Sequence, residues 1–142
     1  MAEVEDIGSE GTVVQANVGK PDEVTRMARD TEGKLGPIDF LVTNAGIAEM
    51  EPPDEMHFEA FKRRMEVNGD GTYLPLMEGG QGMRSRGFGR VVCIASIAGL
   101  RPRANQAAYG VSKAAVIALA RNVAEGWAPA VRINSVAPGL IE

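Results

Sequence analysis

The feature that most constrains the fold is a regular alternation between short apolar runs and longer segments with helical character. Residues 12–18, 38–46, 89–96 and 131–139 are rich in apolar and β-branched residues, and most are closed by glycine or proline, which is typical of strands. The intervening segments predict helices, so the element order is β-α-β-α-β-α-β. Strands joined through helices run parallel with right-handed connections. The sequence therefore predicts an α/β fold with a doubly wound parallel sheet, in which ligands bind beyond the carboxyl ends of the strands.

Three segments are expected to be helical: residues 20–36, 54–86 and 109–126. The first opens with proline and acidic residues and ends at a glycine, as helices commonly do. The second contains Pro75 and three glycines between positions 79 and 82. Helix penalties of ~1 kcal/mol per glycine and ~3 kcal/mol for an interior proline predict that only packing holds this part together.

The run of residues 38–46 is apolar almost throughout, which predicts a strand buried on both faces by helices. The strands around Phe40, Val92 and Ile133 are expected to be parallel neighbours. The strand of residues 12–18 is expected either to stand alone or to lie against the strand of Phe40.

Composition narrows the functional classes. The chain has 142 residues, 44% of them hydrophobic, which predicts a single domain over residues 1–142. A net charge of -4 argues against a nucleic-acid partner. One cysteine, Cys93, and one histidine, His57, make neither a disulfide nor a metal site, and we expect no bound metal. No apolar run is long enough to span a membrane and the start is acidic, so we expect no membrane partner and a cytoplasmic protein.

Five polar motifs follow one another at the ends of the predicted elements. They are "TNAG" at 43–46, "VNGDG" at 67–71, "IASIAG" at 94–99, "YGVSK" at 109–113 and "NSVAPG" at 134–139. In this order and spacing, the chain resembles the short-chain dehydrogenase/reductase family from about Val13 to its last residue. The resemblance implies a Rossmann-type fold and an NAD(P)-dependent oxidoreductase that interconverts an alcohol and a carbonyl.

The resemblance implies four catalytic residues: Asn68, Ser96, Tyr109 and Lys113. Reduction of a carbonyl by hydride leaves an alkoxide that needs a proton, and Tyr109 would be the acid that supplies it from within ~3 Å. A fixed ammonium at Lys113 favours the tyrosinate and in the family also holds the nicotinamide ribose. Ser96 would bind the carbonyl oxygen, and Asn68 would hold a water that relays protons to Lys113.

The resemblance also implies NAD or NADP as cofactor, a small-molecule alcohol or carbonyl compound as substrate, and a homo-oligomer, either dimer or tetramer. Residues 44–46 resemble the turn that approaches the adenine-side ribose, and residues 138–139 the turn that lines the nicotinamide pocket. The residues expected at the cofactor are Asn17, Val18, Asn44, Ala45, Gly46, Tyr109, Lys113, Pro138, Gly139 and Ile141.

Each motif also has a purely structural interpretation. Asn44 fits a turn former, Asn68 a polar residue that bends a helix, and Ser96 the cap of a helix or turn. Tyr109 and Lys113 lie four residues apart on one helix face, where an ordinary surface tyrosine and a solvated lysine would also lie. Residues 138–139 also fit a plain turn.

The sequence departs from the family at one important place. The glycine-rich phosphate loop is missing, because "GSEG" at 8–11 precedes a predicted strand and opens no helix. We therefore expect an incomplete doubly wound sheet without the family's first βαβ unit and last strand. Asn17 stands where the family usually has an aspartate, and Thr43 and Ala95 replace an asparagine and a serine. These departures leave an alternative to the enzyme: a non-catalytic remnant, or a dimerisation module built on helices around 69–86 and 109–126.

Overall fold

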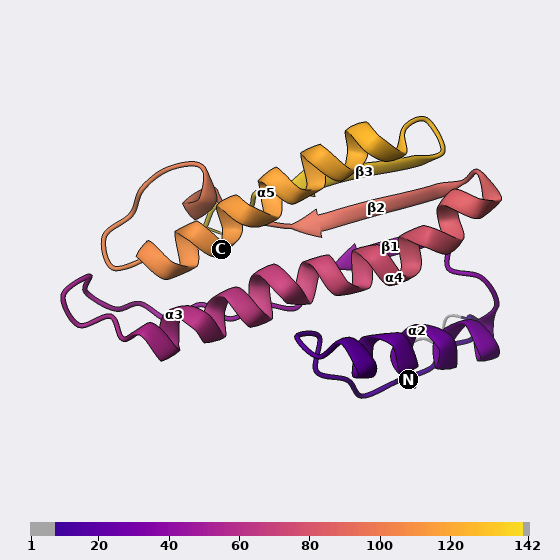
Figure 1. Cartoon of the computed structure of the whole chain (residues 1–142), viewed down its shortest axis with the longest axis horizontal. Coiled ribbons are helices and arrows are strands. Elements are labelled where there is room, and N and C mark those ends of the chain that lie inside the picture. The colour runs from indigo at the N-terminus through magenta and orange to yellow at the C-terminus, as the bar shows by residue number, and fades with distance from the viewer. Residues whose placement is uncertain (1–7, 141–142) are drawn as a thin grey trace.

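The computed structural model describes residues 8–140, which form a three-stranded parallel sheet with helices packed on it (Figure 1). Two short helical segments carry the prefix η: a π-helical turn, η1, and a 3₁₀ turn, η2. In chain order the elements are α2 (Pro21–Leu35), β1 (Phe40–Thr43), α3 (Phe58–Arg64), η1 (Met65–Asp70), α4 (Gly71–Arg86), β2 (Gly89–Ile94), η2 (Ile97–Gly99), α5 (Ala107–Trp127) and β3 (Val131–Val136).

The strand order is β1-β2-β3, and both neighbouring pairs are parallel. Val42 is paired with Val92, and Val92 with Asn134, so all three carboxyl ends meet at one edge. The predicted α/β class and the parallel pairing of the strands around Phe40, Val92 and Ile133 are confirmed.

Helices α4 and α5 lie side by side along one face of the sheet (Figure 1). The core between them and the strands includes Leu76, Met83, Val91, Val116 and Ile133. The segment expected to be a weak helix is continuous as α4, with Pro75 inside it. Gly80 allows the indole of Trp127 to pack directly on its backbone, since a Cβ there would overlap the ring. Packing therefore stabilises α4, whose glycines and interior proline would make it a weak helix by itself.

Within residues 8–140, no helix covers the opposite face of the sheet, because α2 packs on α4 instead. Phe40 is 71% and Val42 60% exposed on this face. The expectation that residues 38–46 form a strand buried on both faces is therefore wrong. β1 is one of the two edge strands of the described sheet, and Phe40 and Val42 have no covering layer in residues 8–140.

Residues 12–18 form no strand, which corrects the expectation for this segment. They lie along α2: the guanidinium of Arg26 donates to the carbonyl of Gln15 at 2.7 Å, and Lys34 donates to Thr12 Oγ1 at 3.2 Å. A strand needs a hydrogen-bonded neighbour. This segment is bonded to helix side chains instead and pairs with no strand of the described sheet, so neither of the two arrangements expected for a strand here is observed.

Candidate active site

A pocket of about 250 Å³ opens at the carboxyl edge of the sheet, where ligands bind in parallel α/β folds. It brings together residues from all three strand ends and from the first turns of α5. Its lining consists of Asn44, Gly46, Ile47, Ala48, Ile94, Ala95, Ser96, Tyr109, Lys113, Pro138 and Gly139. Seven of the residues predicted from the sequence therefore share one pocket: Asn44, Gly46, Ser96, Tyr109, Lys113, Pro138 and Gly139.

Tyr109 and Lys113 project from the same face of α5 into this pocket. Lys113 Nζ lies 5.9 Å from the centroid of the Tyr109 ring. The tyrosine is partly exposed and the lysine is buried, so the pair differs from an ordinary surface tyrosine with a solvated lysine. The helical spacing of the two residues thus places a phenol and an ammonium in one cavity.

Lys113 is the dominant charge of the pocket. Its Nζ donates a hydrogen bond of 2.8 Å to the carbonyl of Ile94 at the end of β2, and it forms no ion pair within the described residues 8–140. Burial lowers the pKa of Lys113 from its ordinary value of 10.5, because desolvation disfavours the ammonium. A buried cation with free N–H donors is suited to binding hydroxyl or anionic oxygens.

Ser96 caps a turn and also lines the pocket. Its Oγ accepts a hydrogen bond of 3.2 Å from the backbone N–H of Ala98 and so caps η2. The same hydroxyl group belongs to a pocket-lining residue, on the same edge of the sheet as Tyr109. Since the cap uses only a lone pair, the hydroxyl proton remains available to a ligand.

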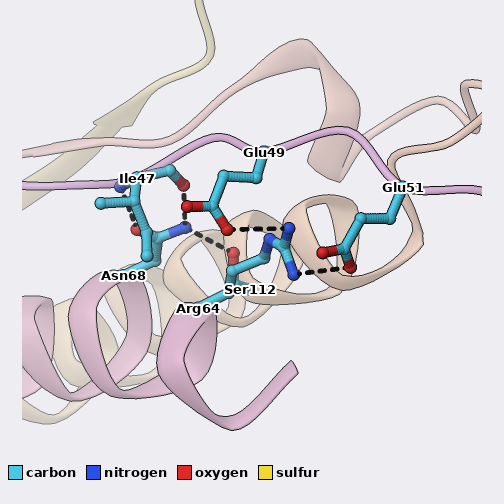
Figure 2. A network of polar contacts seen from close by, with 6 residues as sticks. All are labelled: Ile47, Glu49, Glu51, Arg64, Asn68 and Ser112. Carbon is cyan, nitrogen blue, oxygen red and sulfur yellow. Dashed lines mark hydrogen bonds and ion pairs between the residues drawn. The ribbon is translucent and has the colours of Figure 1, made fainter. Parts of the chain in front are cut away.

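Asn68 lies behind the pocket and does not line it. The residue is fully buried in η1. Its Nδ2 donates to the carbonyl of Ile47 at 3.0 Å and to Ser112 Oγ at 2.8 Å, while its Oδ1 accepts from the N–H of Ile47 at 2.8 Å (Figure 2). All three side-chain bonds go to protein groups, so this amide fastens the pocket loop to η1 and α5.

Gly46 lies close to two buried polar residues, Asn68 and Lys113. A Cβ at this position would lie 3.2 Å from Asn68 Oδ1 and 3.3 Å from Lys113 Nζ. The backbone at Gly46 therefore fills the narrow space between Asn68 and Lys113. The predicted residue Ala45 connects Asn44 and Gly46 without lining the pocket.

The remaining predicted cofactor residues lie elsewhere. Asn17 Oδ1 accepts from the N–H of Gly19, and its own N–H donates to Glu23, so Asn17 forms the turn before α2. Val18 packs at Gly71, where a Cβ would clash with it. Neither Asn17 nor Val18 lines the pocket. Ile141 lies outside the described residues.

Two residues near the site were missed by the sequence analysis: Ser112 and Arg64. Ser112 is fully buried and donates to the carbonyl of Tyr109 at 2.7 Å. Arg64 is 1% exposed, and its guanidinium lies 3.1 Å from both Glu49 and Glu51, between which Figure 2 shows it. Arg64 precedes Asn68 by four residues, so helical spacing could have indicated that both face the same loop.

Within residues 8–140, no group of three or more His, Cys, Asp or Glu side chains could hold a metal ion. The same part of the chain contains no helix with the length and apolar character that crossing a membrane requires.

Comparison with known proteins gives a consistent result. Residues 1–142 match the family model described as short chain dehydrogenase. The chain is 36% identical to the 3-oxoacyl-[acyl-carrier-protein] reductase of Synechocystis, with 99% of this chain and 58% of the relative covered. It is 33% identical to the acetoacetyl-CoA reductase of Allochromatium vinosum, with 95% and 55% covered. The chain thus spans a little over half the length of these relatives.

Solved structures are similar as well. A gluconate 5-dehydrogenase from Burkholderia cenocepacia, in complex with NADP and tartrate, superposes with a TM-score of 0.94 at 29% identity, covering 99% of this chain and 56% of that one. An NAD⁺-bound xylitol dehydrogenase superposes with a TM-score of 0.93 at 33% identity, covering 97% and 54%. Both similar structures contain a nicotinamide dinucleotide.

Proposed function

We propose, since this chain belongs to the short-chain dehydrogenase family, that it carries the acid/base part of an active site that interconverts an alcohol and a carbonyl with NAD or NADP. The observation that carries the proposal is the meeting of Tyr109, Lys113 and Ser96 in one pocket at the carboxyl edge of the sheet. The pocket lining contains no carboxylate that would repel a phosphate-bearing dinucleotide, so the donor set fits such a cofactor.

Tyr109 acts as the acid in the reducing direction. When bound, the cofactor supplies the hydride chemistry. The phenol of Tyr109 gives its proton to the carbonyl oxygen as that oxygen becomes an alcohol, and in the reverse direction the tyrosinate takes the proton from the alcohol. Partial exposure of Tyr109 beside the pocket lets its hydroxyl reach both a substrate and solvent.

Lys113 supports Tyr109 electrostatically. One of its three N–H donors is used by the carbonyl of Ile94, which leaves two for ribose hydroxyls. Its ammonium also stabilises a neighbouring tyrosinate, and the effect is stronger because the site is desolvated. Ser96 donates its free hydroxyl proton to the substrate oxygen and so shares the negative charge that develops there.

The cofactor would lie along the strand ends. Residues 44–46, Pro138 and Gly139 would contact its ribose and nicotinamide portions. Asn17 and Val18 would lie toward its adenine portion. In the whole protein we expect a dimer or tetramer in which the outer faces of α4 and α5 meet a second copy. Exposed Tyr73 on α4 and Val111 on α5 fit this assembly.

One observation favours the alternative, a non-catalytic module. The described residues 8–19 lie against α2, and the turn before this helix contains a single glycine, Gly19, which packs against Glu66, so it is not the glycine-rich turn with which this fold binds pyrophosphate. We therefore expect the 142-residue chain by itself to show no saturable NADH or NADPH binding when nicotinamide fluorescence is followed. Saturable binding at micromolar cofactor would show that another surface replaces that turn.

The acid/base assignment is tested in a chimera that carries this chain in place of the matched residues of the Synechocystis reductase. Tyr109→Phe should lower the rate of carbonyl reduction by about 10²-fold or more, as expected for loss of a general acid, with cofactor affinity nearly unchanged. The chain's other tyrosine provides the control, because Tyr73 does not line the pocket and Tyr73→Phe keeps the apolar ring on α4, so the rate should be unchanged. Near-parental turnover in Tyr109→Phe would refute the role of Tyr109.

A further inference from the structure

We propose that Arg101 and Arg103 form an anion subsite beside the catalytic pocket, and that the carbonyl substrate therefore carries a negatively charged group such as a carboxylate. The inference rests on the proposed function, because it assigns a substrate class to that same site. It is based on two cavities whose linings contain none of the proposed catalytic residues.

The first of these cavities adjoins the catalytic pocket. It has a volume of about 330 Å³ and shares Gly139 with the pocket that contains Tyr109 and Lys113. Arg101 and Arg103 line it together with Ile97, Pro102 and Leu140. A substrate with its carbonyl at Tyr109 could thus place a second group past Gly139 and among the two guanidinium groups.

The second cavity adjoins the first. Its volume is about 430 Å³, and it shares residues 101–103 with the inner cavity. The two arginines therefore border both spaces, between the catalytic pocket and the N-terminal turns of α5. An extended ligand can be accommodated along this path without losing contact with the arginines.

The charged side chains that line the catalytic pocket and the two further cavities are all positive. Their linings contain three cationic side chains, Lys113, Arg101 and Arg103, and no aspartate or glutamate, although the chain as a whole has a net charge of -4. Within residues 8–140 neither arginine forms an ion pair. The local positive charge is therefore available to an anionic ligand.

An acidic loop packs next to the arginine loop but forms no ion pair with it within residues 8–140. The N–H of Glu51 donates to the carbonyl of Asn105 at 2.9 Å, which brings the loop of Glu49 and Glu51 next to the arginine loop. Both carboxylates, however, are paired with the buried Arg64 at 3.1 Å. Arg64 thereby compensates one of these two negative charges, and neither carboxylate forms an ion pair with Arg101 or Arg103 in the described structure.

Backbone hydrogen bonds fix the arginine loop relative to the catalytic residues. The N–H of Arg101 donates to the carbonyl of Ile97 at 2.9 Å, and the N–H of Ile97 donates to the carbonyl of Pro138 at 3.0 Å. Ile97 directly follows Ser96. The backbone of Arg101 is therefore anchored to the same corner as the serine that would bind the carbonyl oxygen, so an anion held by its guanidinium would help to orient the carbonyl.

The test measures binding on the 142-residue chain itself and needs no turnover. Two probes are titrated into ¹⁵N-labelled protein: acetoacetate, which carries a carboxylate, and methyl acetoacetate, its neutral ester. Acetoacetate should give saturable shifts of the amide signals around residues 97–103, while the ester should bind at least about threefold more weakly. Raising the salt concentration should weaken acetoacetate binding, because exposed charges are screened.

Variants assign the effect to the two arginines. The double variant R101Q/R103Q should weaken acetoacetate binding by about three- to tenfold, as expected for loss of two exposed charge pairs. R101K/R103K should retain part of the binding. R121Q/R132Q removes the same number of charges from two exposed arginines of α5 and β3 and should leave the affinity unchanged. The spectra themselves report whether each variant is folded.

Equal binding of the acid and its ester, or unchanged affinity in R101Q/R103Q, would overturn the subsite. A comparable loss in R121Q/R132Q would also overturn it, since the effect would then reflect net charge alone. These outcomes are independent of Tyr109. If acetoacetate binds as expected but Tyr109→Phe leaves turnover intact, the acid/base role is refuted and the subsite is not. If Tyr109→Phe lowers turnover as expected but acetoacetate binding does not depend on the two arginines, only the subsite is refuted.

Discussion

Asn68 Nδ2 lies 2.8 Å from Ser112 Oγ, and this hydrogen bond joins η1 to α5 across 44 residues of sequence. It completes a buried path in which Ile47 of the pocket loop is bonded to Asn68, Asn68 to Ser112, and Ser112 to the carbonyl of Tyr109. Because the Ser112 proton is donated to Tyr109, Ser112 can only accept from Asn68, which determines the orientation of the amide. The path links the proposed acid to the loop that forms the opposite wall of its pocket.

Ser112→Ala should therefore destabilise the protein by about 1–3 kcal/mol, because a buried N–H of Asn68 would lose its acceptor. Ser85→Ala is the matched control. Ser85 is exposed on α4 and its Oγ donates to the carbonyl of Gln81, which is also exposed, so the loss of this bond should cost no more than about 0.5 kcal/mol. Urea denaturation of both variants measures the difference, and equal effects would show that the buried network adds no stability.

Lys113→Met should change how stability depends on pH. Burial lowers the pKa of Lys113 in the folded protein from its ordinary value of 10.5. Between the folded and unfolded pKa values the unfolded chain binds more protons, so in the parent protein Lys113 contributes stability that rises with pH over that window. The free energy of unfolding of Lys113→Met relative to the parent should therefore decrease as pH increases toward 10.5.

Denaturant titrations from neutral to alkaline pH provide the measurement for Lys113. The exposed lysine of α2 serves as control, since Lys34→Met removes one charge without removing a buried ammonium. Burial raises the pKa of the Cys93 thiol, which has the opposite effect on the pH dependence of stability. This contribution cancels when the free energy of unfolding of the parent is subtracted from that of the variant. A pH-independent difference for Lys113→Met would contradict the assigned burial effect.

Gly80→Ala should destabilise the protein although alanine is the better helix former. Alanine normally gains about 1 kcal/mol over glycine within a helix. A Cβ at position 80 would overlap the Trp127 ring, however, and forced repacking costs about 1–3 kcal/mol. At Gly33 on α2 an added Cβ would meet no atom within 4 Å, so Gly33→Ala should be stabilising instead. Shifts of opposite sign in the thermal midpoints would support this account.

Arg64 and its two partners, Glu49 and Glu51, should differ in how much stability is lost when the positive or the negative charges are removed. Removing both carboxylates in E49A/E51A leaves an uncompensated charge on a side chain that is 1% exposed, which should cost about 3 kcal/mol or more. Arg64→Met leaves two carboxylates that already reach solvent, so its cost should be clearly smaller. Chemical denaturation of the two variants compares them. A larger loss for Arg64→Met would show that packing of the arginine stem dominates.

Local sequence patterns were sufficient for much of this protein. The proline, acidic start and final glycine of α2 predicted its bounds to within a residue or two. The apolar runs located all three strands, and the spacing of Tyr109 and Lys113 predicted their common helix face. These features depend on backbone preferences and side-chain periodicity, which act between residues close in the chain.

The tertiary structure decided what depends on distant neighbours. Residues 12–18 have strand composition but pair with no strand, and β1 has an apolar pattern yet exposes Phe40, because burial and ladder pairing depend on which elements are adjacent. The same holds for Asn68, Ser112 and Arg64. Their burial and bonding arise only when η1, α5 and the loop after β1 come together, and no local rule encodes a hydrogen bond between side chains 44 residues apart.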